Sequence, residues 1–147
     1  MICEVTQADM LIAAAVHSVC WRKSHKDICS DEFIGIHTPE YQKKYLEAAL
    51  SKGARLYMLI ENKPVGIVSV RGGLIENLYV LPDEQNKGYG TKLLKFAIEK
   101  CTETPTLWIL STNDGAKRLY ERNGFVETGK IKQLTENLYE LELRFAR

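Results

Sequence analysis

No stretch of this chain is apolar for long enough to cross a membrane, because a helical span needs about 20 mostly apolar residues. Basic residues are not in excess either, and the formal net charge over 147 residues is +1. Binding to nucleic acid or to an anionic bilayer depends on a surplus of lysine and arginine. We therefore expect neither nucleic acid nor a membrane among its partners.

The start of the sequence does not predict a signal peptide either. The apolar stretch Met10–Val16 follows Glu4 and Asp9, whereas a signal peptide begins with a positively charged region. This stretch instead predicts the buried face of a first helix.

Paired cysteines and metal-ligand spacings are absent as well. The four cysteines contain no Cys-x-x-Cys pair, and none of the three histidines is spaced from them like a zinc ligand. The pattern predicts free, mostly buried thiols, a cytoplasmic location and no metal. The residues concerned are Cys3, Cys20, Cys29, Cys101, His17, His25 and His37.

Hydrophobic residues make up 45% of the chain and charged residues 27%, as in ordinary globular proteins. The length suits one domain with its own core, so residues 1–147 are predicted to form a single domain. Periodicity and turn residues predict an α+β fold with one parallel crossover. The expected strands are Ile2–Val5, Arg55–Glu61, Pro64–Arg71, Leu74–Leu81, Thr106–Ser111, Phe125–Thr128 and Asn137–Phe145, and the expected helices are Thr6 or Asp9 to Lys23, Pro39–Ser51, Thr91–Cys101 and Asp114–Asn123.

The most informative segment is the loop Gln85-Asn86-Lys87-Gly88-Tyr89-Gly90, between an apolar strand and an amphipathic helix. The first N–H groups of a helix have no partner within it, its dipole favours negative charge there, and glycines allow a close approach to the backbone. The loop therefore predicts a phosphate site. It lacks the Gly-Lys-Ser/Thr of a Walker loop and the third glycine of a dinucleotide fingerprint.

A second segment, Asn113 to Phe125, follows the strand expected at Thr106–Ser111. Asn113 or Asp114 is a suitable helix cap. Asn113 and Tyr120 are seven residues apart, which places both on one helix face about 10 Å apart along the axis. One ligand lying along this helix could contact both.

Together these segments resemble the GCN5-related N-acetyltransferase (GNAT) superfamily. Gln85-x-x-Gly88-x-Gly90 after a Val-Leu-Pro strand end matches its coenzyme A loop, and Asn113-x-x-Ala116-x-x-x-Tyr120 followed by Gly124-Phe125 matches its next motif. The resemblance covers essentially the whole chain. It implies a mixed, mostly antiparallel sheet with flanking helices, whose strands splay apart at the coenzyme site.

The same resemblance implies an acetyl-CoA-dependent N-acetyltransferase that acts on a primary amine, small or peptidic, by direct attack on the thioester. A non-catalytic acyl-CoA-binding or sensing module is the alternative from another class. Lys87 and Lys92 either add charge to the phosphate site or are solvated surface lysines. The implied coenzyme-binding residues are Leu78, Tyr79, Val80, Gln85, Asn86, Lys87, Gly88, Tyr89, Gly90, Thr91, Asn113, Ala116 and Tyr120.

Two residues are catalytic candidates. Tyr120 is implied as the general acid that protonates the leaving thiolate, although a phenol of pKa about 10 is a weaker acid than a thiol of about 8.5. Glu76 is a candidate base, and strict alternation along its strand predicts that it shares a face with Leu74 and Leu78. A solvated strand-edge carboxylate is the alternative for Glu76.

The acceptor itself has no recognisable sequence code. Five residues between the first two helices are candidates for its pocket, whereas Trp108, in an apolar strand, is expected in the core. Family resemblance also implies a homodimer, for which the alternating apolar pattern of Leu138–Phe145 offers a strand edge. The pocket candidates are Trp21, His25, Glu32, His37 and Tyr41.

Overall fold

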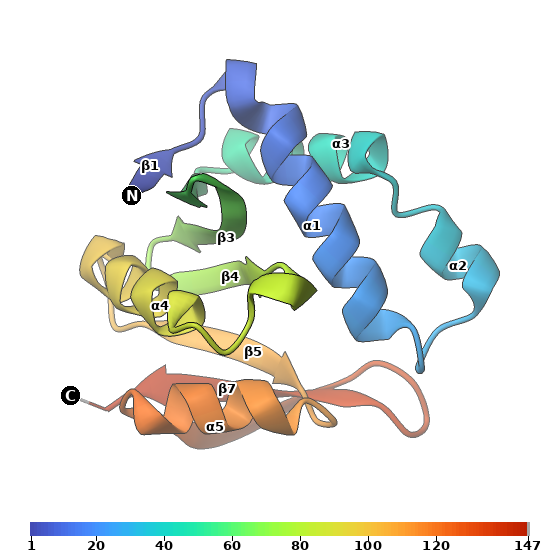
Figure 1. The fold of residues 1–147 in the computed structure, drawn as a ribbon. Coiled ribbons are helices and arrows are strands. Elements are labelled where there is room, and N and C mark those ends of the chain that lie inside the picture. The colour runs from blue at the N-terminus through green and yellow to red at the C-terminus, as the bar shows by residue number, and fades with distance from the viewer. Residues whose placement is uncertain (147) are drawn as a thin grey trace.

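A computed structural model describes residues 1–146 and shows one seven-stranded sheet in the order β1-β2-β3-β4-β5-β7-β6. Helices cover both faces of this sheet (Figure 1). Short 3-10 turns at Gln7–Asp9 and Pro82–Glu84 precede two of the helical regions. The elements are β1 (Ile2–Glu4), α1 (Met10–His25), α2 (Asp31–Gly35), α3 (Pro39–Ser51), β2 (Arg55–Glu61), β3 (Lys63–Arg71), β4 (Leu74–Val80), α4 (Tyr89–Lys100), β5 (Thr106–Leu110), α5 (Asp114–Arg122), β6 (Phe125–Gln133) and β7 (Tyr139–Phe145).

The predicted α+β architecture is confirmed. β4 and β5 are parallel neighbours connected through α4, and every other strand pair is antiparallel. Proline at the first position of α3 and glycine after its end place that helix where the sequence predicts it. Among residues 1–146, no helix is long and apolar enough to span a bilayer.

Three details differ from the sequence-based expectation. α2 was not predicted, because five residues capped by the Ser30 hydroxyl are too few to show a helical period. β6 continues well past Thr128, because Gly129, at φ +92°, accommodates a bulge. β7 lies between β5 and β6, so the free strand edge belongs to β6 and not to Leu138–Phe145.

The core is divided between the two faces of the sheet. α4 and α5 cover one face with Leu93, Leu94 and Tyr120, whereas α1 and α3 cover the other. The four cysteines are free thiols, of which only Cys20 is fully buried, so the expectation of mostly buried thiols was wrong. This layering leaves the carboxyl end of β4 between the two helical layers.

Candidate active site at the split between β4 and β5

The central sheet opens where β4 leaves β5. Within residues 1–146 the two strands pair only at Leu74 and Thr106, near the start of each strand. The rest of the β4 edge therefore faces a cleft of about 950 Å³, which α1, α3, α5 and β7 also line. A split between parallel neighbours exposes backbone donors and acceptors to a ligand, because the adjacent strand does not pair with them.

A bulge in β4 reorients the side chains that line this split. The register with β3 shifts between Ile67 and Ser69, and Asn77 adopts a left-handed φ of 55°. As a result Leu78 packs with the α4 face, whereas Tyr79 packs with the α1 and α3 face. The predicted common face of Glu76 and Leu78 is therefore wrong, because the inserted residue reverses the alternation. Glu76 lies on the side of α1 and α3.

Side chains from three elements hold the bulge. The Tyr45 hydroxyl of α3 donates to Asn77 Oδ1 at 3.4 Å, and Asn77 Nδ2 donates to Ser69 Oγ at 3.1 Å. The Ser69 hydroxyl in turn donates to the Glu76 carbonyl at 3.1 Å, and Ser69 is buried. These three hydrogen bonds hold the backbone on both sides of Asn77. They stabilise the left-handed conformation of Asn77, which is unfavourable for a residue with a side chain.

The loop between β4 and α4 presents a run of backbone donors. Asn86 and Gly88 have φ values of 65° and 85°, and Gly88 is the N-cap residue of α4. In the described part of the chain, no N–H group from Asn86 to Thr91 donates to another protein atom. Gln85 Nε2 donates to the Val80 carbonyl at 3.2 Å, which ties the loop to the end of β4. Such a concave run of N–H groups at a helix start suits an anion.

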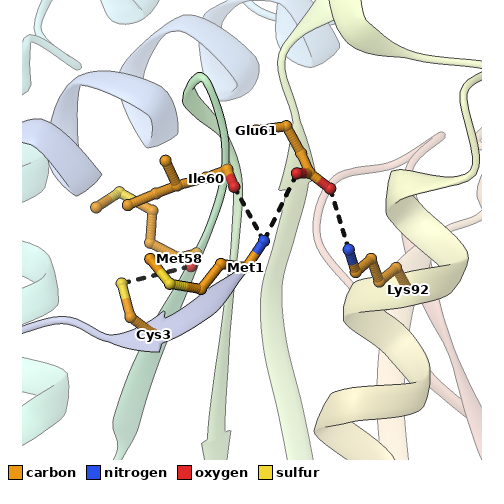
Figure 2. A network of polar contacts seen from close by, with 6 residues as sticks. All are labelled: Met1, Cys3, Met58, Ile60, Glu61 and Lys92. Carbon is orange, nitrogen blue, oxygen red and sulfur yellow. Dashed lines mark hydrogen bonds and ion pairs between the residues drawn. The ribbon is translucent and has the colours of Figure 1, made fainter.

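The two lysines near this loop form ion pairs with protein carboxylates. Lys87 Nζ lies 3.1 Å from Glu84, and Lys92 Nζ lies 3.0 Å from Glu61. Figure 2 shows that Glu61 also faces the N-terminal amine of Met1, at 3.6 Å. Exposed ion pairs of this kind contribute about 0–1 kcal/mol, so a phosphate could displace either carboxylate at little cost.

α5 supplies the second wall of the coenzyme side. The Asn113 side chain caps this helix by accepting a hydrogen bond from the Ala116 N–H at 3.1 Å. Tyr120 is 7% exposed and packs edge-on against Phe125, yet it also lines the cleft. Burial raises the pKa of the Tyr120 hydroxyl, so the phenol stays protonated at neutral pH.

All of the predicted catalytic and coenzyme-binding residues except Lys87 line this one cleft, including Glu76 and Tyr120. Of the predicted acceptor residues, four line it as well, whereas Glu32 lies at a separate depression on α2. The expectation that Trp108 is core was wrong: its ring lines the cleft, with Lys132 Nζ 4.7 Å from the ring centroid. The four are Trp21, His25, His37 and Tyr41.

Several lining residues were not predicted. Glu140 reaches the cleft from β7, where it pairs with Leu110, and it is far in sequence from every motif. Tyr45 and Gln42 come from α3, and His17 comes from α1. An amphipathic pattern predicts the helices but does not show which of their turns meets β4. The alternating pattern of β7 likewise does not distinguish Glu140 from Glu142, which does not line the cleft.

His17 should make stability depend on pH. Its ring is 2% exposed and stacks on Tyr79 at 5.1 Å, and burial, with smaller contributions from His37 and His25, lowers its pKa to about 4. The unfolded chain, with a pKa near 6.5, binds this proton more readily, so stability present above pH 6.5 is lost as pH falls towards 4. We expect a loss of about 2 kcal/mol between pH 7 and pH 5, measured by urea denaturation. His17→Gln should reduce this loss, and an NMR titration of His17 with a midpoint near 6.5 would contradict it.

Comparison with known proteins agrees with this geometry. A family model described as "Acetyltransferase (GNAT) domain" matches residues 52–127. An uncharacterized N-acetyltransferase of Archaeoglobus fulgidus is 27% identical, over 67% of this chain and 87% of the relative. The fold is similar to that of the PaiA N-acetyltransferase of Thermoplasma acidophilum, solved with coenzyme A (TM-score 0.70, 18% identity, 97% and 96% of the chains covered). It is also similar to that of the ribosomal-protein-S18-alanine N-acetyltransferase of Escherichia coli (TM-score 0.75, 19% identity, 100% and 94% covered).

Proposed function

Because this chain belongs to the GNAT family of acetyltransferases, we propose that it transfers the acetyl group of acetyl-CoA directly to a primary amine. One observation supports this above all others. The free N–H groups of the β4–α4 loop and the half-buried edge of β4 open onto the same cleft as Tyr120. A module that only binds acyl-CoA would need the loop and Asn113. A buried phenol at the split supplies a proton donor as well, which catalysis needs and binding does not.

The loop fits the phosphates of the coenzyme. A Cβ placed on Gly88 would meet no atom within 4 Å, so the backbone there is open to a ligand. Asn86 to Thr91 would bind the pyrophosphate through main-chain N–H groups, and Leu78 to Val80 would pair with the pantetheine arm. The bound coenzyme supplies an activated acetyl thioester. A β4 N–H group at the split would then stabilise negative charge on the acetyl oxygen.

Proton transfer would involve two residues on opposite walls. Glu76 would accept the amine proton, directly or through water, from the side of α1 and α3. Tyr120 would donate its phenolic proton to the departing sulfur. Because burial raises the pKa of Tyr120, this transfer is uphill at equilibrium, and its benefit lies in the transition state.

Two further expectations accompany the proposal. A homodimer stays a prediction, and its candidate surface is now the β6 edge, where Val126, Ile131 and Leu134 are exposed. Action in the cytoplasm, where the four thiols stay reduced, also stays a prediction.

A panel of primary amines tests the activity. The purified protein is mixed with acetyl-CoA and each amine, and release of free thiol is followed with a colorimetric reagent. We expect amine-dependent thiol release together with acetylated amine by mass spectrometry. Calorimetric binding of coenzyme A without transfer to any amine would instead support the non-catalytic acyl-CoA-binding module.

A further inference from the structure

Two carboxylates from different strands line the cleft, in the half where the acceptor amine would bind. Glu76 comes from β4 and Glu140 from β7. Among the ion pairs of residues 1–146, none includes Glu76. Glu140 has one partner, Lys132, at 3.9 Å, which is much longer than a charge-assisted hydrogen bond of about 2.7–2.9 Å. Within residues 1–146, neither carboxylate therefore forms a short ion pair with a protein group.

The charges of Glu76 and Glu140 act on two tyrosines that line the cleft. Burial raises the pKa of the Tyr45 hydroxyl and the charge of Glu76 raises it further, whereas the Asn77 hydrogen bond and the charge of Arg71 lower it, and the charge of Glu140 raises it least. Burial likewise raises the pKa of Tyr79, with a smaller contribution from Glu140. Besides Lys132, the lysine and arginine residues of 1–146 that line the cleft are Lys23, at the exposed end of α1, and Arg118 and Arg122, both on α5.

The aromatic walls suit an ammonium group. Trp108 already carries one, because Lys132 Nζ lies 4.7 Å from its ring centroid. Tyr45 presents a further ring surface in the same cleft, whereas the faces of Trp21 stack on His25 and His37. Aromatic faces bind cations through their quadrupole and give no comparable stabilisation to anions. The walls and the two carboxylates therefore select for the same sign of charge.

We propose that the acceptor is a primary amine whose neighbouring carbon carries no carboxylate, and that free α-amino acids are rejected. This inference rests on the proposed function. An α-carboxylate would lie beside the reacting nitrogen, where it would be repelled by Glu76 and Glu140. Glu140 is then a specificity-determining residue, and the positive charge of Lys132 weakens its repulsion of a carboxylate.

Matched pairs of acceptors test the inference, each pair differing only by an α-carboxylate. The pairs are phenethylamine with phenylalanine, tyramine with tyrosine and cadaverine with lysine, the last scored only for acetylation at the α-amine. For a pair that is acetylated, the readout is the ratio of the two kcat/KM values. For a pair that is not, each member is tested as an inhibitor of the best amine of the panel, and the readout is the ratio of the two inhibition constants. We expect the carboxylate-free member to be favoured by about tenfold or more, because two unit charges 7 Å apart interact with that order of energy at an effective dielectric of about 20.

Substitutions on β7 and β6 then assign the preference to Glu140. Glu140→Gln should lower the ratio severalfold, whereas Lys132→Met should raise it. Glu142→Gln is the matched control, since Glu142 lies two residues along the same strand, accepts from the Thr128 hydroxyl and does not line the cleft. Equal use of both members of each pair, or an unchanged ratio in Glu140→Gln, would overturn the inference. A protein that acetylates no amine at all would instead overturn the proposed function.

Discussion

Tyr120→Phe should reduce turnover by about 10²–10⁴-fold while the affinity for coenzyme A stays nearly unchanged. The substitution keeps the ring that packs edge-on against Phe125 and removes only the hydroxyl that lines the cleft. A positioned general acid acts in the transition state, so its loss lowers kcat more than it weakens binding. Steady-state kinetics with an accepted amine, together with calorimetry for coenzyme A, measures both quantities.

Tyr57→Phe provides the matched control for that experiment. Tyr57 lies in the same core cluster, is 3% exposed and has a buried hydroxyl with no hydrogen-bond partner. Removing it should leave turnover unchanged and stability equal or slightly higher, because an unsatisfied buried hydroxyl is costly. If Tyr120→Phe loses less than about threefold in turnover with chemistry rate-limiting, Tyr120 is not the acid.

Gly88→Ala should weaken coenzyme A binding by about tenfold or more. Gly88, the N-cap of α4, has a φ of +85°, and a Cβ added to it would point into open space within the run of free N–H groups. A methyl group there would occupy space that the phosphates need, because glycine permits the closest approach of a ligand to the backbone. Isothermal calorimetry with coenzyme A measures the loss.

The same substitution also strains the backbone, so a control with equal strain is needed. Gly129, at φ +92°, likewise has nothing within 4 Å of an added Cβ, but it lies in β6. Gly88→Ala and Gly129→Ala should each cost about 1–3 kcal/mol in stability. Only Gly88→Ala should change affinity, and an equal loss in both variants would remove the loop from the site.

Local sequence predicted the phosphate loop and the α5 motif because each is a contiguous element. Their N–H groups, caps and glycines follow from a dozen consecutive residues. The split in the sheet was implied by family resemblance and is confirmed by the single β4–β5 pairing. These parts of the site depend on residues close together in the chain.

The acceptor half could not be predicted in the same way. The bulge at Asn77, which places Leu78 on the opposite face from Glu76, depends on Tyr45 and Ser69, each from another element. Glu140 reaches the cleft only because β7 inserts between β5 and β6. Trp108 seemed apolar core because periodicity cannot show that the neighbouring strand has moved away. These features arise from tertiary contacts, which local patterns do not encode.

Because β4 and β5 share a single backbone pairing, a coenzyme bound in the split would also be a structural component of the protein. A ligand that binds the native state and not the unfolded chain stabilises it by about 2.7 kcal/mol at a concentration 100 times its Kd. Here the added hydrogen bonds would join the two parts of the sheet on either side of the split. Resistance to proteolysis and lifetime in the cell would therefore follow the supply of acetyl-CoA, and the abundance of the protein would report on its proposed acetyl donor.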